Sequence, residues 1–544
     1  MNQAVAIAEP PPQVETGIPC REEVRGSRSI RGIVVFLAIL IAGIGYVTRQ
    51  FSRDLSTTAH LSAWTWLLLG SALAIALAFH FVNGFHDTAN AVATVIYTQA
   101  LPPGVAVVWS GIWNLIGVLT SSGAVAFAIL ALLPVDLILQ AGSRTGYAII
   151  FSLLIAALLW NLGTWWLGLP VSSSHTLIGS IIGVGIASQF FGPRTGVDGV
   201  DWHQAVTVFR ALLISPLIGF GGAALLLLLL KGLVRNPALY ESPKGDEPPP
   251  FWIRCLLILT CTGVSFGHGS NDGQKGMGLI MLILIGALPT SYALNHAIGA
   301  GQLREFAVLS QQTIRTLDLD IPPAAAGDPA PVLQPHAELA AFIRTERSTP
   351  NTLPAVRVMV EQIRSEVAPW RSLADVPPPL QQQLRSDMYV TSEALRLLAR
   401  NRHAGFTPAQ AAVLTDYRRQ LDDATRFIPS WVKVAVALAL GLGTMVGWKR
   451  IVVTIGEKIG KQHLTYAQGA AAEIVAAATI IAADNYMPVS TTHVLSSGVA
   501  GTMIANGSGL QLATIRNIAM AWLLTLPAAA LLSASLFWVL HRFV

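Results

Sequence analysis

The sequence predicts an all-α polytopic membrane protein, and three observations point to this fold class. Of the 544 residues, 53% are hydrophobic and only 12% are charged, whereas soluble proteins average about 25% charged residues. The apolar residues form long runs, such as the uncharged run from Ala211 to Leu230, which in a bilayer must be helices that satisfy their own backbone groups. The basic residues lie between these runs, as the positive-inside bias requires, so the net charge of +5 does not indicate a nucleic-acid partner.

The N-terminal part and the apolar runs give the expected order of elements. Residues 1–31 are a polar, proline-rich tail that ends in arginines, and residues 32–50 follow as an additional transmembrane helix. A cleaved signal peptide is disfavoured because the leader is long and no A-x-A site follows. The three cysteines lack the spacing of a disulfide framework or a zinc site. Further apolar segments lie near residues 63–82, 105–133, 145–168, 207–230, 251–266, 276–294, 430–447, 466–483 and 514–539.

An internal repeat organises these segments into two halves. Gly84-Phe-His-Asp87-Thr-Ala-Asn90 matches Gly269-Ser-Asn-Asp272-Gly-Gln-Lys275, with an offset of 272 − 87 = 185 residues. Leu169-Pro-Val-Ser-Ser-Ser-His-Thr176 matches Met487-Pro-Val-Ser-Thr-Thr-His-Val494, with an offset of 488 − 170 = 318 residues. The two offsets differ by 318 − 185 = 133 residues, which is close to the length of a polar stretch at 301–429. Removing that stretch brings both motif pairs into one register, so the chain is a duplication.

The duplication defines the predicted domains. The first repeat spans residues 63–231, and the second is split into 251–300 and 430–540. Residues 301–429 form an insert that is polar, charged and rich in proline, and that contains none of the repeated motifs. We expect a peripheral or regulatory extramembrane domain there, partly helical.

Repeats of this kind predict a secondary transporter, whose substrate site lies near the bilayer midplane where helices are interrupted. The aspartate motifs place glycine and a charge at the end of an apolar helix. The second motifs place proline and a Ser/Thr cluster before the short apolar runs 177–188 and 494–505. We therefore expect an inverted-repeat transporter with broken helices and two re-entrant hairpins, whose helix N-termini end inside the membrane.

The hydroxyl clusters at the starts of these hairpins predict an oxyanion site. Helix N-termini offer unpaired N–H groups and the positive end of a dipole, and Ser and Thr hydroxyls add donors. Such hydroxyls also bond back to carbonyls or join helices, but two clusters in register favour a binding site. His175 and His493 fit either a donor to the ligand or a capping and packing role. The candidate phosphate-binding residues are Ser172, Ser173, Ser174, Thr176, Ser490, Thr491 and Thr492.

Acids and amides in the apolar segments predict where a cation is co-transported. Ionisable groups at membrane depth are rare and usually functional, and an anion in a low-dielectric site requires compensating cations. Carboxylates and amides suit a hard cation, so Na⁺, a proton or a metal ion that travels with the anion would each fit. Asp87 and Asp272 are the expected metal ligands in the last case. The candidate coupling residues are Asp87, Asn90, Asn271, Asp272, Lys275 and Glu473.

At these motifs the chain resembles the inorganic phosphate transporter family, Pit, and is most similar to its low-affinity proton-coupled bacterial permeases. The resemblance covers nearly the whole chain from about residue 63 and rests on residues 83–94, 268–276, 447–458 and 487–493. It implies symport of phosphate with a cation through an inverted-repeat fold that is often dimeric. It also implies cation coordination at the two aspartate motifs and phosphate on the two hydroxyl clusters, and Glu473 matches a glutamate of the family's second half.

Two departures from the family pattern bear on the coupling ion. The family repeats Asn-Asp-Val-x-Asn in both halves, but Lys275 stands where the second-half asparagine would be. Asn114 stands where sodium-coupled relatives carry a glutamate. A fixed ammonium would occupy the place of one Na⁺, unless Lys275 extends to the membrane surface. We therefore expect coupling to H⁺, with Na⁺ as the alternative, and the bacterial relatives add a neutral divalent metal–phosphate complex as a candidate substrate.

The expected function is phosphate import by alternating access, by a homodimer in the plasma membrane, the inner membrane of a bacterium. Sulfate is the nearest alternative substrate, but phosphate at neutral pH can donate a hydrogen bond to a carboxylate and sulfate cannot. An intramembrane phosphotransferase or hydrolase is disfavoured, because the sequence has no nucleophile–base arrangement, Walker loop or H-E-x-x-H motif. A channel is disfavoured by the deep acidic sites. We expect no enzymatic activity and no cofactor.

Overall fold

The computed structural model describes residues 30–55, 62–130, 132, 143–191, 200, 202–243, 247–320, 334–400, 406–483 and 489–543. In this part of the chain the protein is built from helices and has no β-strand, only an isolated bridge between Gly460 and Leu510. This confirms the all-α prediction. The expected polar tail lies outside the described residues apart from its last two positions, and so does Pro488 of the second hydroxyl motif.

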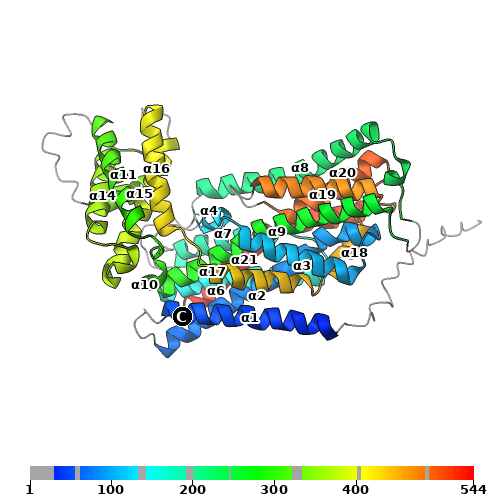
Figure 1. The fold of residues 1–544 in the computed structure, drawn as a ribbon, viewed down its shortest axis with the longest axis horizontal. Helices are drawn as coiled ribbons and strands as arrows, with labels where there is room; N and C mark the ends of the chain where they lie inside the picture. The colour runs from blue at the N-terminus through cyan, green and yellow to red at the C-terminus, as the bar shows by residue number, and fades with distance from the viewer. Residues whose placement is uncertain are drawn as a thin grey trace, which may run out of the picture.

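A bundle of long apolar helices forms the larger part of the molecule (Figure 1). Eight helices of the described chain are long and apolar enough to cross a membrane, and α16 (Pro408–Thr425) with α17 (Ser430–Thr444) passes the same test as a pair bent by 71°. The polytopic prediction is therefore confirmed. The eight helices are α2 (Ala63–Tyr97), α3 (Pro103–Thr120), α6 (Arg144–Trp166), α7 (Ser173–Phe191), α8 (Trp202–Leu233), α9 (Phe251–Ala287), α19 (Tyr466–Ala483) and α21 (Leu512–Leu540).

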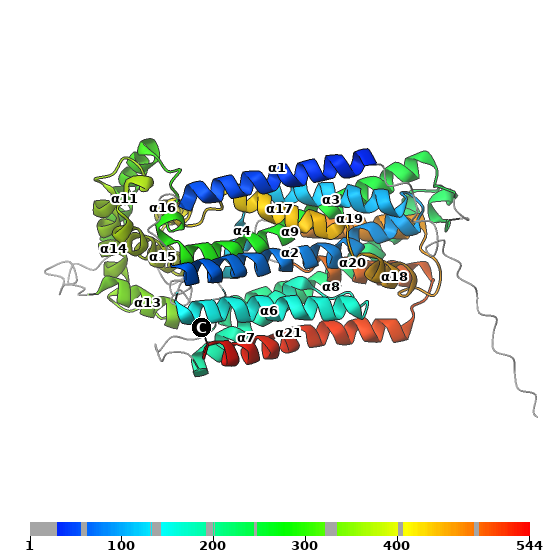
Figure 2. The same cartoon turned by 90° about the horizontal axis from the view of Figure 1, so that it is seen from below.

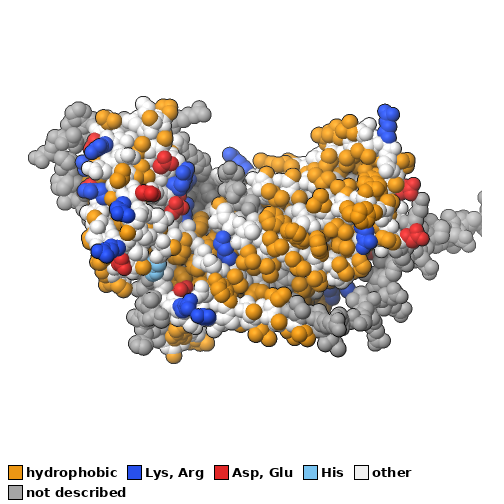
Figure 3. All heavy atoms as spheres, viewed as in Figure 1, with side chains coloured by type: hydrophobic (Ala, Val, Ile, Leu, Met, Phe, Trp, Pro, Cys, Tyr) orange, Lys and Arg blue, Asp and Glu red, His pale blue; other side chains and the backbone are white. Residues whose placement is uncertain are grey.

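The outside of this bundle is apolar. Figure 3 shows hydrophobic side chains over the middle of the bundle, whereas charged ones lie mainly on the separate group of helices and at the opposite end of the bundle. Leu217, Leu523 and Leu531 are 70–72% exposed. Such a continuous apolar surface is expected where lipid tails rather than water cover the protein.

Shorter helices complete the bundle. They are α4 (Ala124–Leu130), α10 (Pro289–Tyr292), α18 (Lys449–Glu457), α20 (Thr491–Asn506) and the 3₁₀ helix η2 (Pro237–Tyr240). The N-terminal run forms α1 (Ile30–Leu55), which packs along α17 and lies on the outside of the bundle in Figure 2. Its described apolar side chains include Ile39 and Ile41, which are 57% and 69% exposed. Its role as an additional membrane span stays a prediction.

The expected breaks at the aspartate motifs are wrong. α2 is one helix of 35 residues and α9 one of 37, and both run without interruption through their motif. The glycines serve close helix packing instead: a Cβ on Gly84 would lie 2.3 Å from the carbonyl oxygen of Leu440, and one on Gly269 would lie 2.1 Å from that of Asn114. Glycine therefore lets α17 and α3 approach these two helices without bending them.

α2 and α9 lie side by side in opposite directions (Figure 2). The contacts fix this direction, because a Cβ on Gly276 would meet the His80 ring, while Asn83 pairs with Asp272 farther along. The two aspartate motifs therefore face each other in the middle of the bundle.

The insert forms a helical group beyond one end of the bundle (Figures 1 and 2). Its helices bury an apolar core of their own, in which Val356, Met359 and Leu395 are 0–2% exposed. These helices lie within residues 300–425, and the limits 301 and 429 and the extramembrane location of the insert stay predictions. They are α11 (Ala300–Asp320), α13 (Pro335–Thr345), α14 (Thr352–Val367), η3 (Leu373–Asp375), α15 (Pro378–Arg400) and α16.

Candidate functional site

The two hydroxyl motifs start two buried helices in the same way. Ser172 precedes α7, and its Oγ accepts a hydrogen bond from the N–H of His175 at 3.3 Å. Ser490 precedes α20 and caps it through the N–H of His493 at 3.1 Å. Thr176 donates back to the Ser172 carbonyl. The helix ends are thus completed by Ser172, Ser490 and Thr176. The other N–H and hydroxyl groups in the first turns of α7 and α20 face the bundle interior.

Asp87 is where the two halves meet. Its Oδ1 accepts hydrogen bonds from Thr492 of α20 and from Asn90 at 3.3 Å, and its Oδ2 accepts one from Ser173 of α7 at 3.3 Å. Asn90 also donates to Thr492 Oγ1 at 3.0 Å. Asp87 is 2% exposed. One carboxylate therefore joins an aspartate motif to both hydroxyl clusters.

Asp272 has a different environment. Its Oδ1 lies 2.6 Å from Lys275 Nζ, and its Oδ2 accepts a hydrogen bond from Asn83 at 3.3 Å. Lys275 also donates to the Ser174 hydroxyl and to the Val489 carbonyl at 3.4 Å. Lys275 is 1% exposed, so its side chain points into the bundle and does not extend to the surface.

His268 connects the two aspartates. Its Nε2 lies 3.7 Å from Asp87 Oδ2 and 3.7 Å from Asp272 Oδ2, and its Nδ1 lies 2.6 Å from Asn114 Oδ1. Ligand atoms of Asp87, His268 and Asp272 all lie within 4.8 Å of one another, which makes them a candidate metal site among the described residues. Two carboxylates and an imidazole suit a divalent transition metal, and the Asn114 contact orients the ring as an outer partner would.

The sequence analysis quoted His268 within a motif but gave it no role. The signal was available: residues 268 and 272 are four apart, so both side chains lie on one face of a helix. The motif was interpreted as a helix end, and residues four apart share a face only in a continuous helix. The proximity of His268 and Asp272 was therefore not predicted.

Glu473 stands apart from the aspartates. It is fully buried on α19 and accepts hydrogen bonds from Thr94 of α2 and Thr260 of α9. Thr94 follows Asp87 by seven residues, which is about 10 Å along a helix. Glu473 therefore forms a second buried polar site, between α19 and the same two helices. Asn271 is also fully buried, and neither its Nδ2 nor its Oδ1 has a hydrogen-bond partner.

The two motif histidines pack against each other. The ring centroids of His175 and His493 lie 4.5 Å apart, and His493 stacks on Trp522 at 4.0 Å. This favours the packing role over donation to a ligand. Thr491, the last candidate residue, is buried at the first turn of α20.

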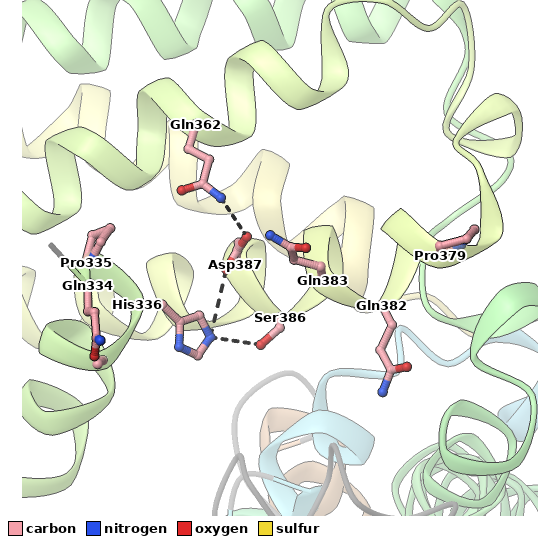
Figure 4. A pocket seen from close by; sticks show the side chains of 10 residues that line it. Gln334, Pro335, His336, Gln362, Pro379, Gln382, Gln383, Ser386 and Asp387 are labelled. Atoms are coloured by element: carbon pink, nitrogen blue, oxygen red, sulfur yellow. Dashed lines mark hydrogen bonds and ion pairs between the residues drawn. The ribbon is translucent and has the colours of Figure 1, made fainter.

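The insert holds a pocket of its own, far from these residues in the sequence. It lies between α13, α14 and α15, where His336 Nε2 is 2.9 Å from Ser386 Oγ and 3.9 Å from Asp387 Oδ1 (Figure 4). Gln362 donates to Asp387 Oδ2 at 3.3 Å. The sequence analysis did not anticipate this cluster, because its members come from three different helices.

Comparisons with known proteins agree with the motifs. The model of the phosphate transporter family matches residues 83–533, which include both aspartate motifs and both hydroxyl motifs. The chain belongs to the phosphate transporter family. The low-affinity inorganic phosphate transporter PitA of Escherichia coli (strain K12) is 41% identical over 504 residues, which cover 89% of this chain and 99% of PitA. PitB of the same strain is 41% identical over 505 residues, which cover 88% and 98%.

A solved structure of a protein described as "The sodium-dependent phosphate transporter" is also similar to this chain. It is 20% identical, covers 88% of this chain and 100% of that chain, and has a TM-score of 0.49.

Proposed function

We propose that this protein imports inorganic phosphate together with H⁺ across the plasma membrane by alternating access. Two observations support the substrate: the family to which the chain belongs, and the PitA and PitB relatives, which are named as low-affinity inorganic phosphate transporters. The observation that carries the proposal is the meeting of both hydroxyl clusters at Asp87 and Lys275.

The chemistry of this meeting point suits a protonated oxyanion. Ser173, Ser174 and Thr492 supply hydroxyl donors beside two helix N-termini, and Lys275 supplies a positive charge. Asp87 accepts hydrogen bonds only, so it discriminates in favour of an anion that carries a proton. Phosphate does at neutral pH, and sulfate does not. Unlabelled sulfate should therefore fail to compete with labelled phosphate uptake.

Coupling to H⁺ is supported by the charges around Asp272. In this half Lys275 already compensates the charge of the carboxylate at 2.6 Å, so the site does not need a separate Na⁺ that arrives without an anion. Asn114 contributes a neutral amide to His268 where a glutamate would have added a charge. Both substitutions lower the demand for Na⁺ at this site, and a Na⁺-coupled symporter remains the alternative that the experiment below tests.

The cluster of Asp87, His268 and Asp272 supports a metal–phosphate complex as a further form of the substrate. All three ligand atoms lie within 4.8 Å of one another, next to the hydroxyl donors. A divalent ion held there would share the phosphate oxygens and reduce the charge that crosses the membrane. The metal ion is cargo in this proposal.

Alternating access through an inverted repeat is supported by matched helix contacts. α3 packs on α9 as α17 packs on α2, α7 packs on α21 as α20 packs on α8, and α6 packs on α21 as α19 packs on α8. A Cβ on Gly117 would lie 2.2 Å from the Phe266 carbonyl, and one on Gly443 would lie 2.0 Å from the Phe81 carbonyl. Because α2 and α9 are antiparallel, the two halves fit a two-fold axis in the membrane plane, with α7 and α20 as the re-entrant elements. A homodimer is part of the proposal.

The deciding experiment is phosphate uptake by purified protein in proteoliposomes, with independently set Na⁺, H⁺ and Mg²⁺ gradients. We expect saturable uptake that an inward H⁺ gradient drives in Na⁺-free buffer. A strict requirement for a Na⁺ gradient at fixed pH and membrane potential would replace H⁺ by Na⁺. Release of phosphate from esters by the purified protein would favour an enzyme instead.

A further inference from the structure

Arg385 of the insert is a buried cation without a counter-charge. It lies on α15 and is only 5% exposed, and its Nε has no hydrogen-bond partner in the part of the chain that the structure describes. The neighbouring acids are already engaged, because Glu393 pairs with Arg426 and with Arg396, while Asp422 pairs with Arg426 at 3.3 Å. Among the described residues no carboxylate forms an ion pair with Arg385.

This arrangement is unfavourable for the protein alone. Burying a charged group without a partner is costly, and a guanidinium does not escape the cost by losing its proton. Burial and the nearby Arg426 lower the pKa of Arg385 only to about 10, so it stays cationic at neutral pH. Because Arg385 stays charged and buried without a carboxylate partner, the insert favours binding of an anion next to it.

A second guanidinium lies beside the same aromatic ring. The Cζ atoms of Arg385 and Arg426 are 5.9 Å and 5.4 Å from the centre of the Tyr389 ring. Arginines present planar, forked donors that match the oxygens of a phosphate group. Arg426 already pairs with Glu393 and Asp422, so Arg385 supplies the uncompensated charge beside the Tyr389 ring.

The site lies where the insert joins the membrane bundle. Arg426 directly follows α16, which leads into α17 (Figure 1). Asn295, near the end of α9 and α10, bonds to the backbone carbonyls of Ala424 at 2.9 Å and Asp423 at 3.0 Å. An anion bound here would therefore contact the segment that connects the insert to α17.

We propose that Arg385 and Arg426, beside Tyr389, form a binding site for a phosphate group in the insert, separate from the transport site. The phosphate group comes either from free inorganic phosphate or from a lipid headgroup at the membrane surface. This site is independent of the proposed transport mechanism and stands if that mechanism fails.

The test compares the full-length protein with an Arg385→Met variant by hydrogen–deuterium exchange of α15 and α16. Without anion, the variant should exchange no faster than the wild type, because methionine fills the space and removes an unpaired charge. Inorganic phosphate should slow exchange in the wild type, by about tenfold at ten times its Kd, and should leave the variant unchanged. Arg419→Met is the matched control: Arg419 is 70% exposed, and its loss should preserve the phosphate response.

The source of the phosphate group is decided by the surrounding lipid. If free phosphate is the ligand, the protection develops in detergent with added phosphate. If a lipid is the ligand, it develops in phosphatidylglycerol nanodiscs without phosphate. Arg385→Met should abolish either effect. The proposal is overturned if neither condition gives protection that depends on Arg385, or if Arg385→Met speeds exchange equally in every condition, as a purely structural role requires.

Discussion

Lys275 and Asp272 form an ion pair inside the membrane bundle, three residues apart on α9, with 2.6 Å between Nζ and Oδ1. Both side chains are at most 2% exposed. Lys275 also donates to Ser174 in the other half of the chain. The pair thus places a fixed positive charge against the first hydroxyl cluster. Among the described residues, Asp87 has no lysine partner of this kind.

Replacing Lys275 by asparagine should abolish most uptake in Na⁺-free buffer. The change leaves Asp272 as an unpaired buried carboxylate, and breaking a buried pair typically destabilises the folded protein by about 3–5 kcal/mol. If the ammonium stands in for an ion, added Na⁺ should restore part of the rate. The measurement is the initial rate of phosphate uptake in proteoliposomes with and without Na⁺. The exposed Lys231 supplies the control, Lys231→Asn, and full Na⁺-free activity of Lys275→Asn would refute the role of the lysine.

Replacing Asp87 by asparagine should reduce phosphate uptake by about a hundredfold or more while the protein still folds. Asp87 accepts hydrogen bonds from Asn90, Ser173 and Thr492, and an amide can accept at one of its two ends only. Loss of one buried hydrogen bond to a charge and of the charge itself removes about 3 kcal/mol or more.

Asp272→Asn should have a comparable effect, because it leaves Lys275 without its carboxylate. Both variants are measured by uptake and by thermal stability of the purified protein, beside Asp416→Asn on the exposed face of α16. Normal transport by both aspartate variants would contradict the core of the proposed mechanism.

Features that occur in both halves of the chain could be predicted from the sequence. The register of the two motif pairs predicted a duplication and selected Asp87, Ser173 and Thr492 as candidate residues, and the long apolar helices confirm the membrane class. Lys275 was identified as a departure from the family pattern, but the direction in which its side chain points could not be predicted. A lysine side chain is long enough to reach either a surface or an acid one turn away, and only the packed neighbours decide which.

Other features depended on packing that no local pattern records. Glycines at 84 and 269 suggested helix ends, whereas they allow two neighbouring backbones to approach closely. Glu473 was selected as a coupling residue, but the sequence does not give its position, about 10 Å from Asp87 along α2 through its bonds to Thr94 and Thr260. His268 was missed because the motif was read as an interruption. The misread glycines and the missed histidine share one cause, because each required knowing that the helices are continuous.

The stability of the insert should fall as the pH rises from about 4 to 7, through Asp387. Burial and the nearby Glu366 raise the pKa of Asp387 to about 7. The folded state therefore holds a proton that the unfolded state releases at lower pH, and stability decreases wherever the folded state binds more protons. His336 Nε2 lies 3.9 Å from Asp387 Oδ1, beside the titrating carboxyl.

Hydrogen–deuterium exchange of α15, corrected for the intrinsic pH dependence of exchange, measures this effect. Protection in the wild type should decline between pH 5 and pH 8, and Asp387→Asn should flatten the decline. Asp416→Asn, at an exposed acid on α16, should keep the wild-type slope. An unchanged slope in Asp387→Asn would show that another group titrates.

Alanine at Gly84 or Gly269 should impair folding and transport to a similar degree. A Cβ at these positions would lie 2.3 Å and 2.1 Å from a neighbouring backbone carbonyl, and backbone cannot move aside as a side-chain tip can. Overpacking of this kind costs about 1–3 kcal/mol or more and would separate α17 from α2 or α3 from α9, which changes the spacing of Asp87 and Asp272. Gly70 is the matched control on α2: nothing lies within 4 Å of its Cβ position, so Gly70→Ala should be neutral or stabilise the helix by about 0.5–1 kcal/mol. Thermal unfolding and uptake of the three variants measure this, and wild-type behaviour of Gly269→Ala would mean that α3 and α9 do not pack this closely.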